Sequence, residues 1–133
     1  MLDFNIPEIL KKSGNIAIVG LSPKTARPSY QVAEYLLQAG YNIFPVNPGQ
    51  QKILGRNCYP DLDSIHEKID IVNIFRSPKY VPAIVEDAIR LKIGVIWMQQ
   101  GIVHEEAAKR AKNAGVQVVM DRCIKVDHMN LDS

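Results

Sequence analysis

The segment Asn15-Ile16-Ala17-Ile18-Val19-Gly20 decides the fold, because a continuous aliphatic run between two glycines is typical of a strand that is buried on both faces. Such strands belong to parallel sheets that helices cover on both sides. Helical periodicity resumes after the glycine, which predicts a strand–turn–helix unit. We therefore expect further units of this kind along the chain.

Short aliphatic runs predict four more strands, at residues 42–46, 70–75, 95–98 and 117–120. Helices are predicted at residues 3–12, from the cap Ser29 to Gly40, around 62–68, from Ser77-Pro78 onward and at 105–114. Strands that alternate with helices require right-handed crossovers and a mostly parallel sheet. We therefore expect one α/β domain over residues 1–133: three layers, doubly wound, with five strands in the order 3-2-1-4-5.

The composition describes one globular domain, with 47% hydrophobic and 23% charged residues among 133. The apolar runs are shorter than the ~20 residues of a membrane span, and acidic Asp3 lies where a signal peptide would be basic, so we expect a cytoplasmic protein.

The net charge of +2 leaves no broad basic field for a nucleic acid. Cys58 and Cys123 form no C-x-x-C pair, so we expect reduced thiols and no metal site.

The loop after the first strand is the first candidate for ligand binding, because ligands of doubly wound sheets bind at the carboxyl ends of the strands. It contains Gly20, the hydroxyls of Ser22 and Thr25, and the cations Lys24 and Arg27, just before a helix. Free amides and the helix dipole favour phosphate at such a place. The loop is therefore a candidate phosphate cradle, and the alternative is an ordinary turn with solvated cations.

Two further loops end at the same edge. Asn47-Pro48-Gly49 combines rigid and permissive backbone, so it could shape a slot for an adenine or a ribose, or be only a turn. Arg76 follows the strand at 70–75, where it could add a charge for a diphosphate or be a surface arginine. Lys52 and Arg56 are treated as solvated.

Two common nucleotide motifs are missing. Gly20 is followed by Leu21-Ser22-Pro23 and not by the rest of G-x-G-x-x-G, and the second strand ends in Asn47 and not in an acid for a ribose hydroxyl. No G-x-x-x-x-G-K-[ST] occurs in the chain. These departures argue against NAD and ATP as ligands.

Cys123 is the candidate nucleophile of this edge. A helix N-terminus or the neighbouring Arg122 would lower the pKa of its thiol. No histidine can be placed beside it, since His66 and His104 are expected on helices and His128 in a tail without predicted structure. We therefore expect a structural thiol, with a catalytic pair as the alternative.

Several motifs, taken in order, cover nearly the entire chain: Ile18-Val19-Gly20-Leu21-Ser22 with Arg27-Pro28-Ser29-Tyr30, Tyr41-Asn42-Ile43-Phe44-Pro45-Val46-Asn47-Pro48, Ile53-Leu54-Gly55, Phe75-Arg76, Trp97-Met98-Gln99-Gln100-Gly101 and Val119-Met120-Asp121-Arg122-Cys123. In this order and spacing they resemble the small single-domain CoA-binding proteins of bacteria and archaea. That family is similar to the N-terminal CoA-binding domain of the succinyl-CoA synthetase α subunit.

The resemblance implies a Rossmann-like domain that binds coenzyme A at the carboxyl edge. The first loop would surround the diphosphate, and the loop after the second strand would lie near the adenosine. The positions that the resemblance implies as CoA contacts are Ser22, Pro23, Lys24, Thr25, Gln50, Phe75, Arg76 and Ser77. Gln50 departs from the lysine of the synthetase pattern, so Lys52 or Arg56 would have to supply that charge.

The resemblance also bears on catalysis. The synthetases depend on a phosphorylated histidine in a second domain and on a partner subunit, and 133 residues have room for neither. We therefore expect non-catalytic binding of CoA or a short acyl-CoA, as a carrier or sensor, with no nucleic acid or membrane partner. A homodimer or an unknown protein partner is left open. The alternatives are acyl or thiol transfer through Cys123, an NAD(P)-dependent oxidoreductase, and an interaction module without a ligand.

Overall fold

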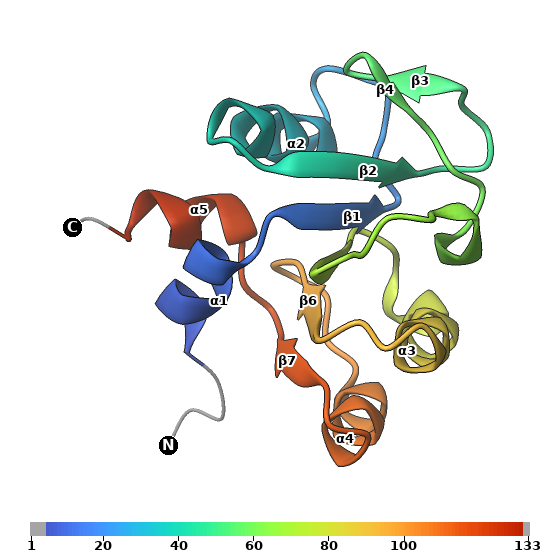
Figure 1. Ribbon diagram of the computed structural model, residues 1–133, viewed down its shortest axis with the longest axis vertical. Helices are drawn as coiled ribbons and strands as arrows, with labels where there is room; N and C mark the ends of the chain where they lie inside the picture. The colour runs from blue at the N-terminus through green and yellow to red at the C-terminus, as the bar shows by residue number, and fades with distance from the viewer. Residues whose placement is uncertain (1–4, 132–133) are drawn as a thin grey trace.

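A five-stranded parallel sheet forms the centre of the molecule (Figure 1), as seen in a computed structural model that describes residues 5–131. Its strands in spatial order are β2 (Asn42–Val46), β1 (Asn15–Val19), β5 (Ile71–Ile74), β6 (Val95–Met98) and β7 (Gln117–Val119). Each neighbouring pair is parallel. The predicted five-stranded parallel α/β domain is confirmed.

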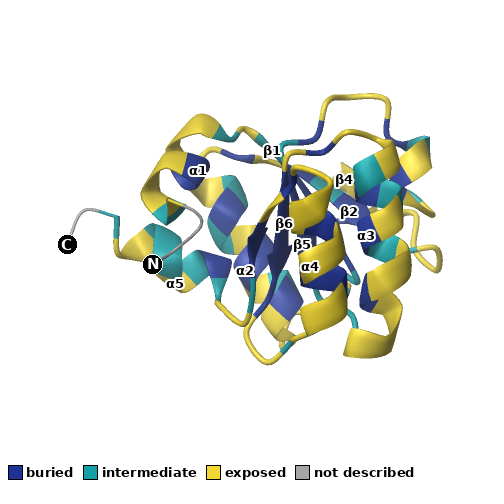
Figure 2. Ribbon diagram, turned by 90° about the horizontal axis from the view of Figure 1, so that it is seen from below, coloured by how far each residue is buried: buried dark blue, intermediate teal, exposed yellow. Residues whose placement is uncertain are grey.

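Helices cover both faces of this sheet (Figure 2). One face packs against α1 (Ile6–Lys12), α2 (Pro28–Gln38) and α5 (Ile124–Met129), and the other against α3 (Val81–Arg90) and α4 (Glu105–Asn113). Alternate residues of each strand feed the two cores, so Ile16 and Ile18 join the first and Ala17 and Val19 the second. The three predicted layers are therefore present.

The strand order differs from the prediction. The chain leaving β2 forms a small hairpin, β3 (Lys52–Ile53) and β4 (Arg56–Asn57). Tyr59 then donates its N–H to the Pro45 carbonyl and accepts the Asn47 N–H, both at 2.9 Å. This stretch takes the place beside β2 where the predicted third strand would pair, and β5 pairs on the far side of β1. The order 3-2-1-4-5 is wrong, and the five strands run 2-1-3-4-5.

Two helix starts also differ from the prediction. Helix α2 begins at Pro28 with Arg27 as its N-cap, so Ser29 is not the cap. The Ser29 hydroxyl instead accepts the N–H of Ser22 at 3.0 Å, which ties the preceding loop to the helix. The helix predicted around 62–68 is only a 3₁₀ turn, η1 (Leu62–Ser64), and its N-cap Asp61 accepts the Ser64 N–H at 2.9 Å.

The remaining differences lie near the two ends and in the middle of the chain. The N-terminal helix starts at Ile6, and residues 3–4 of its predicted range lie outside the described residues. The helix predicted from Ser77 is a 3₁₀ turn, η2 (Pro78–Tyr80), followed by α3. The tail without predicted structure is α5.

Among the helices of residues 5–131, none has both the length and the apolar character that a bilayer crossing needs.

Candidate functional site

The turn at the end of β1 brings two edge loops into direct contact. Gly20 has a φ of +92°, and a Cβ atom added there would lie 2.6 Å from the Phe75 carbonyl oxygen and 2.9 Å from Cδ of Arg76. Both the dihedral angle and the space therefore demand glycine. As a result, the backbone after β1 lies against the first residues after β5.

Hydrogen bonds fix the loop that follows Gly20. The Ser22 hydroxyl accepts the N–H of Lys24 at 3.1 Å, while the Ser22 N–H binds the Ser29 hydroxyl. Asn47, just beyond β2, donates its side-chain amide to the Leu21 carbonyl at 2.9 Å. The Asn47 side chain thus joins the loops after β1 and β2. Because its amide group is used for this contact, Asn47 has a structural role.

A pocket of about 290 Å³ lies between the loops after β1, β2 and β5. Its lining consists of Val46 and seven residues that the sequence singled out: Gly20, Ser22, Pro23, Arg27, Asn47, Pro48 and Arg76. The structure therefore brings residues from three separate loops to one hollow at the carboxyl edge, where doubly wound sheets bind their ligands.

Two arginines give this pocket positive charge, and the described part of the chain pairs neither of them with a carboxylate. The guanidinium carbon of Arg76 lies 4.1 Å from the centre of the Tyr80 ring, and within residues 5–131 neither Arg76 nor Arg27 has a carboxylate at ion-pair distance. Helix α2 starts at this pocket, and no side chain caps it. Unpaired guanidinium groups beside an uncapped helix start are suited to an anion.

The other five predicted site residues do not line this pocket. Lys24, Gln50 and Ser77 are exposed on the same loops. The side chain of Phe75 packs against the core beneath α1, α2 and α5. Thr25 lines a different hollow, of about 400 Å³, together with residues of α2 and Lys125 from α5.

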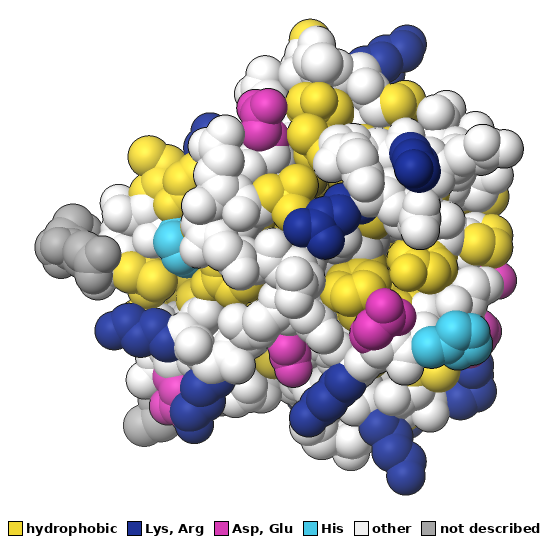
Figure 3. All heavy atoms as spheres, turned by 45° about the horizontal axis from the view of Figure 1, so that its top comes forward, with side chains coloured by type: hydrophobic (Ala, Val, Ile, Leu, Met, Phe, Trp, Pro, Cys, Tyr) yellow, Lys and Arg dark blue, Asp and Glu magenta, His cyan; other side chains and the backbone are white. Residues whose placement is uncertain are grey.

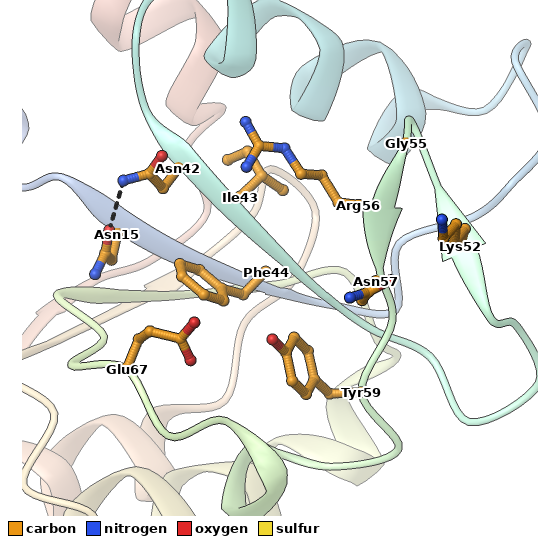
Figure 4. Close-up of a pocket in the computed structure, with 10 residues that line it drawn as sticks. All are labelled: Asn15, Asn42, Ile43, Phe44, Lys52, Gly55, Arg56, Asn57, Tyr59 and Glu67. Atoms are coloured by element: carbon orange, nitrogen blue, oxygen red, sulfur yellow. Dashed lines mark hydrogen bonds between the residues drawn. The ribbon is translucent and has the colours of Figure 1, made fainter.

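Lys52 and Arg56, the two candidates to replace a lysine at Gln50, line yet another hollow. This hollow of about 530 Å³ runs along the outer edge of β2 (Figure 4), with Glu67 opposite the two cations. The rings of Phe44 and Tyr59 lie side by side in it, with centres 6.2 Å apart. Neither cation therefore lines the pocket at Gly20.

Of the two neighbours that the sequence suggested for Cys123, the helix N-terminus is present and the Arg122 cation is paired. Cys123 is the N-cap of α5 and does not line the pocket at Gly20. The guanidinium of Arg122 is held by Asp127 through two hydrogen bonds of 2.8 Å. His128 Nδ1 shares a 2.7 Å hydrogen bond with the Tyr35 hydroxyl. Within residues 5–131 no histidine is hydrogen-bonded to Cys123.

The other titratable groups are spread out. His104 is the N-cap of α4 and accepts the Ala107 N–H at 3.1 Å, while His66 lies between η1 and β5, so neither is inside a helix. Both cysteines are free, and burial raises the pKa of the Cys58 thiol. In the described part of the chain, no three His, Cys, Asp or Glu side chains come together as a metal site would require.

Two polar features near the edge were missed from the sequence. Nothing in the sequence distinguishes Tyr80 from an ordinary surface tyrosine, yet the Arg76 guanidinium lies over its ring. Asn73 is fully buried in β5, where its amide nitrogen lies 3.2 Å from Oε1 of Gln99, and the same oxygen accepts the Ile124 N–H at 3.4 Å. A lone asparagine inside an aliphatic strand was the available signal for this second feature.

The surface charge is dispersed. On the face shown in Figure 3, Lys and Arg side chains lie as separate groups among acidic, apolar and neutral ones. This arrangement agrees with the net charge of +2. An anion on this face meets individual cations and no continuous basic patch.

Comparison with solved structures gives the same fold. A hypothetical protein from Pyrococcus horikoshii OT3 matches with a TM-score of 0.93 and 41% identity, over 96% of this chain and 90% of that one. A Thermus thermophilus protein matches with a TM-score of 0.91 and 34% identity, over 96% of this chain and 99% of that one.

Sequence relatives fall into two size classes. The protein named "uncharacterized protein YneT" from Bacillus subtilis (strain 168) is 44% identical over 92% of this chain and 91% of its own length. An acetate–CoA ligase (ADP-forming) II from Archaeoglobus fulgidus is 30% identical over 83% of this chain, but only 17% of the ligase is matched. The profile of the family described as "CoA binding domain" matches residues 14–129. The chain therefore belongs to the CoA binding domain family.

Proposed function

We propose that this protein binds coenzyme A, or a short acyl-CoA, at the carboxyl edge of its sheet as a cytoplasmic carrier or sensor, without turning the ligand over. The observation that carries the proposal is the pocket at Gly20 in a chain of the CoA binding domain family. Arg76 and Arg27 line this pocket, and neither has a carboxylate partner within residues 5–131. The name of the ligase relative, whose matched part is this domain, adds support.

The chemistry of the pocket suits the diphosphate of CoA. The backbone at Gly20 and the hydroxyl of Ser22 would border the phosphates, and Arg27 and Arg76 would neutralise them. Pro48 lies on the loop that would border the adenosine. Gln50, Lys24, Thr25, Phe75 and Ser77 stay candidates from the resemblance, and the pocket supplies no support for them.

The absence of turnover is proposed from the surroundings of Cys123. An acyl-transfer nucleophile needs a base, a cation or a helix N-terminus beside it. Cys123 has the N-terminus of the six-residue helix α5, but the neighbouring cation and histidine are already engaged. The Arg122 guanidinium is already bound by Asp127, and His128 is hydrogen-bonded to Tyr35. These contacts support a ligand-binding role over thiol chemistry.

Calorimetric titration tests the proposal. CoA, acetyl-CoA, NAD and ATP would be titrated into the full-length protein at one fixed salt concentration, since phosphate binding depends on salt. We expect saturable heat with CoA or acetyl-CoA, and weaker binding of NAD and ATP, which share only the phosphates and the adenosine with CoA. Acetyl-CoA incubated with the protein should be recovered intact by chromatography. Silence with CoA at millimolar concentration, a preference for NAD, or release of free CoA would each contradict the proposal.

A further inference from the structure

We propose that Tyr80 is a positioning residue for the pocket at Gly20, where its ring holds the Arg76 guanidinium so that the N–H edge of that group is ready for a diphosphate. This inference rests on the proposed function, because it names how that same site recognises its anion. Tyr80 itself does not line the pocket, so it would act through Arg76.

The side chain of Arg76 is restrained at both ends. Its Cδ lies so close to Gly20 that a Cβ atom there would be 2.9 Å away, so the aliphatic stem crosses the glycine backbone. Its guanidinium then lies over the ring of Tyr80, 4.1 Å from the ring centre. An arginine held in this way loses less conformational freedom when it binds a ligand.

The backbone that carries the Tyr80 ring is fixed by its turn. Tyr80 ends η2, and its N–H donates to the Ser77 carbonyl at 3.0 Å, while Pro78 fixes the φ of the first turn residue. The side chain is 42% exposed and belongs to neither core. The position of the ring is therefore better explained by its contact with the Arg76 guanidinium than by burial in a core.

Stacking and phosphate binding use different parts of the guanidinium. A ring contacts the flat face of the group, whereas its five N–H donors point outward in the plane. Arg76 can therefore stay on Tyr80 while it binds phosphate oxygens. Within residues 5–131 no carboxylate competes for those donors.

Lys79 offers a matched control, because its ammonium lies 5.1 Å from the centre of the same ring but does not line the pocket. If the ring merely gathered positive charge near the site, both cations would matter for binding. If it positions one guanidinium, only Arg76 should depend on Tyr80.

The test is a double-mutant cycle with two probes, CoA and inorganic pyrophosphate. Tyr80→Leu should weaken binding of both about fivefold, and Tyr80→Phe, which keeps the ring face, should restore binding to within about twofold of the wild type. In the Arg76→Ala background, Tyr80→Leu should have no further effect. Lys79→Ala should leave affinity unchanged at matched ionic strength.

A second measurement does not require any ligand. The Nε–H proton of Arg76 should show a ring-current shift by NMR that Tyr80→Leu removes and Tyr80→Phe keeps. An unshifted signal in the wild type, an unchanged affinity of Tyr80→Leu, or an equal loss in the Arg76→Ala background would overturn the inference.

The two probes separate this inference from the proposed function. Pyrophosphate binding that depends on Tyr80, together with silence toward CoA, would overturn the proposed function and leave the role of Tyr80 standing. CoA binding that is unchanged by Tyr80→Leu would support the proposed function and overturn the role of Tyr80. Silence of the wild type toward both probes would overturn both.

Discussion

The arginines on the surface of α3 and α4 and those that line the edge pocket at Gly20 are placed in opposite ways. Arg90 binds Asp63 and Asp87, and Arg110 binds Glu86 through two hydrogen bonds of 2.9 and 3.1 Å. Arg27 and Arg76 have no such partner within residues 5–131. Within residues 5–131, the two arginines of this helical surface are paired with carboxylates, and the two of the edge pocket are not.

The paired and the unpaired arginines should therefore contribute to different properties of the protein. Exposed ion pairs add little to stability, because water and salt screen them. An unpaired guanidinium group that is held in one place lowers the cost of binding an anion. Substitutions in the two regions should therefore change different properties.

The largest effect is expected at the glycine on which the edge pocket is built. Gly20→Ala should lower the free energy of unfolding by about 2–4 kcal/mol, since a strained φ is combined with a clash against the Phe75 carbonyl, and CoA binding should be lost. Gly40→Ala is the control, because Gly40 has a φ of +103° but open space around it, and about 1 kcal/mol is expected. Urea denaturation measures both. Equal losses would show that the contact at Gly20 is unimportant.

Arg76→Ala should follow, with CoA affinity reduced about tenfold because a charge-assisted contact is lost. Its melting temperature should stay that of the wild type. Arg110→Ala is the matched change on the helical surface, and its CoA affinity should be unaltered. Calorimetry and a thermal melt on both variants provide the measurement. Equal CoA affinity of the two variants would contradict the assignment of Arg76 to the binding site.

A smaller effect concerns pH. The hydrogen bonds from Arg90 hold the pKa of the exposed Asp63 carboxyl below its ordinary value of 3.8. Because the folded pKa lies below the unfolded one, this pair stabilises the fold at neutral pH, and the contribution is lost as the pH falls through the folded pKa. An NMR titration should place the Asp63 midpoint higher in Arg90→Ala than in the wild type. Coincident midpoints would mean that the pair does not form in solution.

The smallest effect is expected for Cys123→Ser. Because Cys123 lies outside the pocket and has no hydrogen-bonded histidine within residues 5–131, the substitution should leave CoA affinity unchanged. The wild type and the variant should both leave acetyl-CoA intact. Acetyl-CoA cleavage that disappears in the variant would revive the thiol-transfer alternative.

The sequence predicted what depends on local periodicity. Buried strands such as Asn15–Val19 show as aliphatic runs, and glycines such as Gly20 and Gly40 show as element ends. The strand order could not be predicted in the same way, because it depends on backbone hydrogen bonds that Tyr59 makes to Pro45 and Asn47. Those bonds use groups that every residue carries, so they leave no side-chain pattern.

The candidate site was only partly predictable for a similar reason. Glycine and cations after buried strands point to the carboxyl edge, and Arg27 and Arg76 indeed line one pocket with Gly20. The family resemblance suggested that Lys52 or Arg56 could replace a lysine at Gln50, but both residues line the hollow on the outer side of β2. Tyr80 depends on a stacking contact within a short turn, and residue type alone does not reveal such a contact.

The contacts of Tyr59 with β2 also hinder the pairing of this edge strand with a second copy of the protein. A sheet edge with free N–H and C=O groups invites another chain to add a strand, which is a route to aggregation. Pro45 has no N–H to offer, its carbonyl is already taken by Tyr59, and the next outward N–H, that of Asn47, is occupied as well. The carboxyl half of β2 is therefore closed to strand addition, so in concentrated solutions of the folded protein no further strand should pair with this half of the edge.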